Sequence, residues 1–183
     1  MVAEELGRAA CGGVPLAIGV QTDMATPALA RFGSKELREE FLNPAIRGEY
    51  VASIAVSEVH AGSDVAAVKT TAKKDGDDYV INGSKMWITN GPDADVMVVY
   101  AKTNPELGAK GMTAFIVEKG MEGFATAQKL DKLGMRGSHT GEMAVKNVEV
   151  PSENILGSLN GGVKVLSSGL DYERAVLAAG PTG

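Results

Sequence analysis

The chain has 183 residues, enough for one domain with a sizeable core or for one domain and part of another. Its net charge of −5, without a cluster of lysine or arginine, argues against a nucleic-acid partner. No apolar run approaches the roughly 20 residues of a membrane helix, the single Cys11 excludes a disulfide framework, and two histidines argue against a zinc site.

Residues 1–48 are expected to be helical. The turn signals Thr26-Pro27 and Phe32-Gly33 interrupt this region, and the run Gly12-Gly13 is a candidate break or kink in its first helix. Ser34 is expected to cap a helix. The apolar residues that follow it recur at helical spacing; they are Leu37, Phe41, Leu42 and Ile46.

Residues 50–150 have the pattern of a β domain. Asp75-Gly76 and Asn82-Gly83 are typical hairpin turns and predict three short strands, near 70–72, 79–81 and 86–88. Further strands are expected at 50–57, 95–102, 112–118 and 141–150. About seven strands at this spacing favour a sandwich or a barrel.

Trp87, the single tryptophan, lies near the end of the third of these short strands. Two interpretations of it remain open. A lone tryptophan most often fills a hydrophobic core. Alternatively, its flat ring lies beside a flat ligand while the nearby Thr89 hydroxyl forms a hydrogen bond with the edge of that ligand.

The last helix, expected at about 163–179, carries a carboxyl group in an unusual position. On a helical wheel with about 100° per residue, Glu173 falls within the apolar stripe of Leu166, Leu170 and Leu177. Burial would raise the pKa of such a carboxyl, which suits a general base in a dry pocket. The alternative is that the stripe faces water, or that a basic residue from elsewhere pairs with Glu173.

Three segments, in this order along the chain, resemble one known family. They are VSEVHAGSD at 56–64, WIT at 87–89 and LDYER at 170–174. Together they resemble the flavin-dependent acyl-CoA dehydrogenases, and especially the isovaleryl-CoA dehydrogenase branch. The runs KLGMRGS at 132–138 and GMTAFIV at 111–117 also resemble that branch, so the resemblance covers nearly the whole chain.

The resemblance implies an α+β fold in three parts. Residues 1–48 match the end of an N-terminal helical domain, 49–152 match a central antiparallel β-barrel or sandwich domain, and 153–183 match a linker and the first helix of a C-terminal helical bundle. The rest of that bundle is absent from the sequence. We therefore expect a fragment, a natural truncation or a short relative, which alone would bind FAD weakly and turn over poorly.

The resemblance also implies FAD as the cofactor. The residues expected to bind it are Ile54, Val56, Ser57, Gly62, Ser63, Trp87, Ile88 and Thr89. Trp87 would lie alongside the isoalloxazine ring, and Thr89 would form a hydrogen bond near N5. Ser63 would lie near the FAD phosphate or the acyl-CoA, and Asp64 would cap the following turn.

Substrate residues follow from the same resemblance. Glu173 matches the catalytic base of the isovaleryl branch, and Leu177 would line the acyl pocket. Asp171 and Arg174, which can also pair with each other on the helix, match positions that contact CoA. Ser63 and Lys110 complete the expected substrate contacts.

The sequence departs from the family pattern at several of these positions. Val59-His60 replaces a proline-led pair, and we interpret His60 as a solvated loop residue. Ala109-Lys110 differs from the pair expected near CoA, although Lys110 can still serve a phosphate. Lys164 stands where the branch has an aromatic residue, which weakens one expected CoA contact.

The implied reaction is α,β-dehydrogenation of a short branched-chain acyl-CoA. Glu173 would remove the α-proton, the flavin would accept the β-hydrogen, and an electron-transferring flavoprotein would take the electrons. A homo-oligomer is expected for the full-length family. The chain lacks a visible targeting segment, so a reducing compartment is expected: the bacterial cytoplasm or the mitochondrial matrix. Two alternatives remain: an acyl-CoA oxidase-like flavoenzyme, and a non-catalytic fragment that binds flavin or acyl-CoA.

Overall fold

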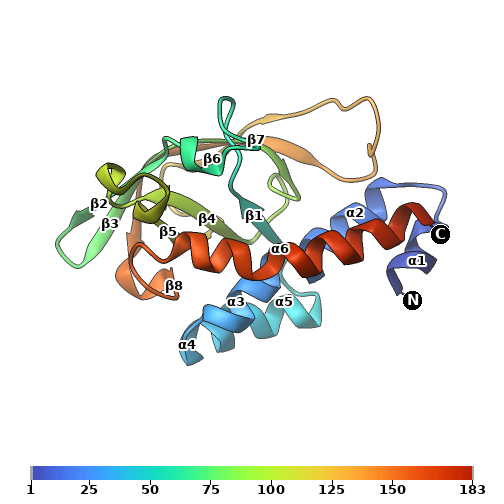
Figure 1. Ribbon diagram of the computed structural model, residues 1–183, viewed down its shortest axis with the longest axis horizontal. Helices are drawn as coiled ribbons and strands as arrows, with labels where there is room; N and C mark the ends of the chain where they lie inside the picture. Colours follow the sequence, from blue (N-terminus) through green and yellow to red (C-terminus); the bar gives the residue numbers. More distant parts are fainter. Residues whose placement is uncertain (1, 183) are drawn as a thin grey trace.

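The computed structural model describes residues 2–182 and places a sheet against helices from both ends of the chain (Figure 1). The N-terminal helical elements are α1 (Val2–Gly7), α2 (Gly13–Gly19), the π-helical η1 (Val20–Ala25), α3 (Thr26–Phe32), α4 (Lys35–Leu37), the π-helical η2 (Arg38–Leu42) and α5 (Asn43–Arg47). The expected break at Gly12-Gly13 is confirmed, because α1 ends at Gly7 and α2 begins at Gly13.

Local signals explain the boundaries of the helices after α3. The Ser34 hydroxyl accepts a hydrogen bond from the Leu37 N–H at 3.2 Å, which confirms the expected N-cap of α4. Gly48, with φ of 77°, ends α5 in the left-handed conformation that glycine adopts without strain. The apolar spacing predicted the inner face correctly for Leu37, Phe41 and Leu42, whereas Ile46 is 70% exposed.

Eight strands form the sheet: β1 (Ala52–Ala55), β2 (Thr71–Asp75), β3 (Asp78–Thr89), β4 (Val96–Lys102), β5 (Met112–Glu118), β6 (Phe124–Lys129), β7 (Thr140–Pro151) and β8 (Ile155–Leu156). Their order is β6-β7-β3-β2-β4-β5-β8, and β1 pairs with β4. Most neighbours are antiparallel, but β4 pairs in parallel with β1 and with one residue of β2. The α+β class is therefore confirmed. Sequence patterns missed β6, whose residues are nearly all exposed, and the two-residue β8.

One of the two expected hairpin turns is present and the other is not. Gly76, with φ of 60°, lies in the turn between β2 and β3, as predicted. The prediction of a turn at Asn82-Gly83 is wrong, because both residues lie inside β3 at a shift in its pairing with β7. A Cβ at Gly83 would lie 2.4 Å from the Thr70 Oγ1 atom. Glycine here allows a close approach of neighbouring segments and does not reverse the chain.

The sheet has a buried core on each face. Val96, Val98 and Tyr100 of β4 belong to the cluster that packs under the helices, whereas Met97 and Val99 belong to the cluster on the opposite face. This strand is therefore covered on both sides. Three short 3-10 segments connect the strands: η3 (Val65–Ala67), η4 (Pro105–Gly111) and η5 (Ser152–Asn154).

The long helix α6 (Gly162–Ala179) runs beneath the sheet toward α1 and α2, so that both ends of the chain lie side by side (Figure 1). It is followed by η6 (Gly180–Thr182). A Cβ at Gly162 would lie 2.8 Å from the Met112 carbonyl oxygen, so glycine lets the helix begin directly against β5. No helix within residues 2–182 is long and apolar enough to cross a membrane.

The buried face of α6 differs from the face that the leucine spacing indicated. Its buried residues are Gly162, Val165, Gly169 and Glu173. The expected centre of the apolar stripe is therefore wrong, since Leu177 is 38% exposed and Leu166 and Leu170 are only partly buried. Gly162 allows the start of this face to approach β5 closely, whereas the space at Gly169 is taken by the Glu173 side chain of the same helix.

Candidate active site

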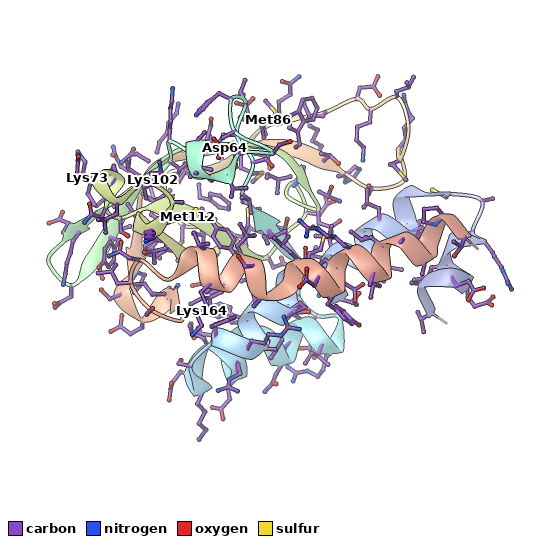
Figure 2. The ribbon with its side chains drawn as sticks, viewed as in Figure 1. Asp64, Lys73, Met86, Lys102, Met112 and Lys164 are labelled. Atoms are coloured by element: carbon purple, nitrogen blue, oxygen red, sulfur yellow. The ribbon has the colours of Figure 1, made fainter. Side chains whose placement is uncertain are left out.

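The segment 56–64 is attached to β3 by hydrogen bonds from two consecutive residues. The Met86 N–H donates to the Ser57 carbonyl oxygen at 2.9 Å. The Lys85 Nζ atom donates to the Val56 carbonyl oxygen at 3.0 Å. Figure 2 labels Met86 of β3 and Asp64, the last residue of the segment. The structure thus brings together the two segments that were expected to bind the flavin.

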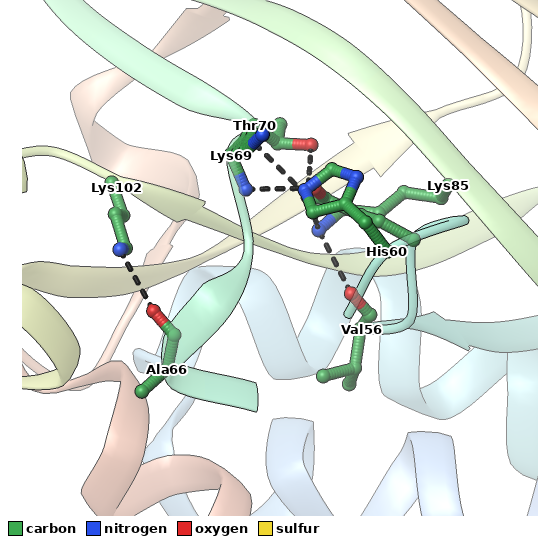
Figure 3. Close-up of polar contacts among 8 residues, drawn as sticks. Val56, His60, Ala66, Lys69, Thr70, Lys85 and Lys102 are labelled. Carbon is green, nitrogen blue, oxygen red and sulfur yellow. Dashed lines mark hydrogen bonds and ion pairs between the residues drawn. The ribbon is translucent and has the colours of Figure 1, made fainter. Parts of the chain in front are cut away.

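A buried carboxylate, Glu58, organises this segment from within (Figure 3). It accepts hydrogen bonds from the Lys69 N–H at 2.7 Å, from the Thr70 N–H at 3.0 Å and from the Thr70 hydroxyl at 2.6 Å. The Lys85 Nζ atom completes the set at 2.9 Å. Both carboxylate oxygens therefore have donors, which is what a buried charge requires.

The charges of Glu58 and Lys85 determine each other's ionisation. Burial of the Glu58 carboxyl opposes its ionisation, but the Lys85 charge and the donors of Thr70 and Lys69 outweigh that effect and hold the pKa of Glu58 at about 2. Burial lowers the pKa of Lys85, and the Glu58 carboxylate counteracts that shift. We interpret the two groups as an ion pair at neutral pH.

His60 lies beside this ion pair. Its Nε2 atom is 3.3 Å from the Glu58 Oε2 atom, and its side chain is 42% exposed. The expectation of a solvated loop residue therefore describes only part of its surroundings, because the Nε2 atom contacts the buried carboxylate.

Sequence reasoning missed Glu58, Thr70 and Lys85 as functional residues. One signal was available for Lys85. In β3, the buried residues Tyr79 and Ile81 alternate with less buried ones, and Lys85 continues the inward series. A lysine at an inward position of a strand needs a buried anionic partner.

The end of β3 presents Trp87 to the surface. The pairing with β7 shifts between Lys85 and Ile88, and Trp87 has φ of 65° within this bulge. Its side chain is 62% exposed, whereas the Ile88 side chain is buried in the core at 3%. The interpretation of Trp87 as a core residue is therefore wrong. That it forms the wall of a ligand site remains a prediction.

The other residues expected to bind the flavin lie around this bulge. Thr89 is partly buried, and its carbonyl oxygen accepts a hydrogen bond from the Ser53 hydroxyl at 2.7 Å. Ile54, Val56 and Ser57 are partly buried, and Gly62 and Ser63 are exposed. Asp64 caps η3, as expected, since its Oδ1 atom accepts from the Ala66 N–H at 3.0 Å.

Glu173 lies on the buried face of α6 and is 6% exposed. Burial raises the pKa of Glu173, as does the charge of Asp23, while Arg174 and Arg31 act in the opposite direction. No ion pair within 4.0 Å reaches it among the described residues. The expectation of a buried carboxyl with a raised pKa is confirmed, and the alternatives in which it faces water or pairs with a base are wrong.

The Glu173 carboxylate turns back along its own helix toward Gly169. A Cβ at Gly169 would lie 2.4 Å from the Glu173 Oε1 atom. The absence of a side chain at Gly169 therefore provides the space that the carboxylate occupies. This arrangement keeps the carboxylate between the helix and the rest of the molecule.

A cavity of about 640 Å³ opens one helical turn beyond Glu173. Residues from both ends of the chain line it, including Leu6, Leu16, Tyr172, Val176 and Leu177, together with Met135 of the loop between β6 and β7. Most of this lining is apolar, which suits an acyl chain better than a charged ligand. Leu177 is thus on the wall of a cavity, as expected, although the identity of its occupant is a prediction.

The residues expected to contact CoA are dispersed over the surface. Asp171 and Arg174 form the expected helical pair at 3.8 Å, with both side chains largely exposed. Lys110 is an exposed residue of η4, and Lys164 lies on the outer side of α6 near its start (Figure 2). The structure does not gather these groups into one pocket within residues 2–182.

Two family descriptions match the chain. Residues 53–148 match the acyl-CoA dehydrogenase middle domain, and residues 1–49 match the acyl-CoA dehydrogenase N-terminal domain. The chain is 52% identical to the mitochondrial isovaleryl-CoA dehydrogenase of Pongo abelii over 185 residues, and 54% identical to that of Solanum tuberosum over 180 residues. It covers 44% and 43% of these relatives, so it spans less than half of their length.

Solved structures agree with these matches. Butyryl-CoA dehydrogenase from Megasphaera elsdenii superposes with a TM-score of 0.94 at 36% identity, over 97% of this chain and 46% of that one. A structure described as the electron transferring flavoprotein of Acidaminococcus fermentans gives a TM-score of 0.94 at 38% identity, over 97% and 47%. The complex of glutaryl-coenzyme A dehydrogenase with glutaryl-CoA gives 0.93 at 34% identity, over 98% and 45%.

Proposed function

The chain belongs to the acyl-CoA dehydrogenase family, and from this premise we propose that it carries the base and part of the flavin site of an FAD-dependent enzyme. The proposed reaction is α,β-dehydrogenation of a short branched-chain acyl-CoA of the isovaleryl type. The single observation that carries this proposal is Glu173, a buried carboxyl with a raised pKa beside an apolar cavity.

Glu173 is the proposed general base. A carboxylate that has lost most of its hydration is a stronger base than one in water, because the protonated form is favoured by burial. The α-proton of a thioester is weakly acidic, so a desolvated acceptor held near the substrate is an advantage. The position of Glu173 on the buried face of α6 supports such a role.

The residues around the β3 bulge fit an FAD ring system. An exposed indole at Trp87, beside a loop whose backbone is held in place by Lys85 and Glu58, offers a flat apolar wall next to ordered polar groups. Thr89 and Ser57 would supply polar contacts to the edge of the ring. When bound, FAD supplies the acceptor for the two electrons that leave the substrate.

The acyl chain would occupy the cavity that Leu177 and Val176 line. Leu177 lies four residues after Glu173, so one helix would place both the base and the pocket wall. Ser63, Lys110, Asp171 and Arg174 remain the proposed contacts for the CoA portion.

An electron-transferring flavoprotein is the proposed electron acceptor. The similarity to the structure described under that name from Acidaminococcus fermentans supports this partner. A homo-oligomer is proposed for the complete protein, since association of subunits would cover exposed apolar residues outside the cavity, such as Ile46 and Leu133.

The proposal is tested by anaerobic reduction of the FAD-loaded protein with isovaleryl-CoA. The loss of flavin absorbance measures the rate of reduction. We expect reduction of the wild type and a loss of at least roughly a thousandfold in rate for Glu173→Gln, which keeps the shape of the side chain and removes the base. Glu153→Gln, which makes the same change at an exposed carboxyl of η5, is the matched control. Full reduction by Glu173→Gln would contradict the proposal.

A second measurement separates the dehydrogenase from an oxidase. The reduced protein is reoxidised with molecular oxygen or with a one-electron dye. A dehydrogenase reacts readily with the dye and slowly with oxygen, whereas an oxidase reacts readily with oxygen. Rapid reoxidation by oxygen would mean that oxygen, and not an electron-transferring flavoprotein, accepts the electrons.

A further inference from the structure

Tyr100 carries a buried hydroxyl without a hydrogen-bond partner. The side chain is 0% exposed, and its oxygen is the one buried side-chain polar atom in residues 2–182 that lacks a partner. Buried polar groups in proteins almost always form hydrogen bonds, so an unpaired hydroxyl calls for an explanation. A phenylalanine would fill the same space without this penalty.

Tyr100 belongs to the side of the sheet on which α6 packs. It lies in the same core cluster as Val165 of α6, and its strand neighbour across the sheet is Ala114 of β5. The buried face of α6 continues from Val165 through Gly169 to Glu173. The phenol and the carboxyl are therefore two buried polar groups in one interface between helix and sheet.

The Glu173 carboxylate also forms no hydrogen bond in the described part of the chain; Glu173 is 6% exposed and, unlike the Tyr100 oxygen, its carboxylate oxygens are not completely buried. Its carboxylate turns toward Gly169, which lies between it and Val165 along the helix. Three rotatable side-chain bonds allow the carboxylate to move within this space. An ionised carboxylate in a buried interface needs a donor.

The other charged groups that face Glu173 come from three elements. Arg174 of α6 and Arg31 of α3 are exposed, and the Arg31 Nη1 atom donates to the Ser168 carbonyl oxygen at 2.5 Å. Asp23 of η1 is itself an anion. The charge of Glu173 in turn raises the pKa of Tyr100, and Tyr100, unlike Arg174 and Arg31, is a fully buried donor.

We infer that the Tyr100 hydroxyl donates a hydrogen bond to the Glu173 carboxylate when that carboxylate is ionised, which makes Tyr100 a positioning residue for the base. This inference rests on the proposed function of Glu173. Burial and the charge of Glu173 both raise the pKa of Tyr100 above its usual range, so the phenol keeps its proton and remains a donor. The hydrogen bond would satisfy both groups at once.

The proposed hydrogen bond changes the pKa of Glu173, and with it the pH dependence of the rate, in a definite direction. A donor to the ionised carboxylate stabilises the charged form and so lowers the pKa of Glu173 from the value that burial alone would produce. Removal of the hydroxyl would raise that pKa. Because the base acts in its ionised form, the acidic limb of the rate profile would move to higher pH.

The test uses Tyr100→Phe, which removes one oxygen atom and preserves the ring. The matched control is Tyr79→Phe, a buried tyrosine in the cluster on the opposite face of the sheet. Difference infrared titration measures the protonation of Glu173 directly, with its band identified by its loss in Glu173→Gln. The pH profile of the reductive rate with isovaleryl-CoA is measured on the same FAD-loaded proteins.

We expect Tyr100→Phe to raise the titration midpoint of Glu173 and the acidic limb of the rate profile by about one pH unit, the shift expected for loss of a hydrogen bond to a charged group. Tyr79→Phe should leave both unchanged. A Tyr100→Phe midpoint identical to that of the wild type would overturn the inference.

These measurements distinguish a failure of the proposed function of Glu173 from a failure of the inference about Tyr100. If Glu173→Gln retained full activity, Glu173 would not be the base, and the infrared midpoint would still decide whether Tyr100 forms the hydrogen bond. If Glu173→Gln lost activity while Tyr100→Phe left both midpoints unchanged, only the inference about Tyr100 would fail.

Discussion

The Lys85 Nζ atom and the Glu58 Oε1 atom lie 2.9 Å apart, and neither side chain is more than 3% exposed. Lys85 also donates to the Val56 carbonyl oxygen, so one buried amine connects β3 to the loop expected to bind the flavin. The ion pair therefore determines where the loop lies relative to Trp87, two residues further along β3. Its main consequence is geometric, since buried ion pairs seldom add much net stability.

Replacement of Lys85 by methionine should be strongly destabilising, because it leaves the Glu58 carboxylate buried without its cation. We expect the free energy of unfolding to fall by about 3–5 kcal/mol. Glu58→Gln combined with Lys85→Met should cost less than the sum of the two single changes. Lys119→Met, which removes an exposed pair with Asp95, is the control, with a loss of at most about 1 kcal/mol.

Chemical denaturation of these variants gives the required free energies. Equal effects of Lys85→Met and Lys119→Met would contradict the structural role of the buried pair. Additive effects of Glu58→Gln and Lys85→Met would show that the two groups do not depend on each other.

The pKa of Glu58 predicts how stability changes with pH. Folding lowers that pKa from an ordinary 4.5 to about 2, so its contribution is complete above pH 4.5 and is lost as pH falls toward 2. The stability difference between wild type and Glu58→Gln should therefore be constant above pH 4.5 and shrink below it. Unfolding free energies at successive pH values measure this difference.

The control for this pH window is Glu49→Gln. Glu49 pairs with Arg47 at the surface, at 2.8 Å, with both side chains more than half exposed. Solvent screens that pair, so little stability depends on it. A difference between wild type and Glu58→Gln that stayed constant down to pH 2 would rule out the lowered pKa.

Trp87→Ala should weaken FAD binding with little effect on folding. The indole is 62% exposed, so its removal costs little core packing. Loss of an aromatic contact of about 1 kcal/mol corresponds to roughly fivefold weaker binding. Fluorescence titration of FAD measures the affinity, and thermal unfolding without FAD measures the stability. Leu107→Ala, at a site 51% exposed in η4, should change neither.

Gly169→Ala should reduce the rate of flavin reduction without unfolding the protein. The added Cβ would lie 2.4 Å from the Glu173 Oε1 atom, and the flexible carboxylate would have to move away. Alanine also favours a helix over glycine by about 1 kcal/mol, which offsets part of the strain. We expect a rate loss of roughly tenfold or more, since small displacements of a base are costly.

The control for Gly169 is Gly134→Ala. Gly134 is exposed and lies outside the cavity lining, and nothing lies within 4 Å of an added Cβ. Stability and rate are measured for both variants by thermal unfolding and by anaerobic flavin reduction. An unchanged rate in Gly169→Ala would mean that the carboxylate position near Gly169 has no part in the reaction.

Local signals in the sequence were sufficient for several elements. Ser34 has the hydroxyl of an N-cap, and Asp75-Gly76 has the residues of a tight turn, so each could be interpreted without its surroundings. The same reasoning failed at Asn82-Gly83, because the close approach of Thr70, and not a chain reversal, accounts for the glycine there. A dipeptide signal cannot distinguish these two causes.

The sequence by itself determined the family resemblance, the α+β pattern and the presence of an unusual carboxyl at Glu173. Only the tertiary structure decided the partners of Glu58 and the exposure of Trp87, because the first depends on contacts over more than ten residues and the second on a bulge in β3. The tertiary structure also decided that the face of α6 with Gly162, Gly169 and Glu173 packs on the side of the sheet that carries Tyr100. Helical spacing indicated the leucine face, since a wheel records hydrophobicity and not the close contact with β5 that Gly162 permits.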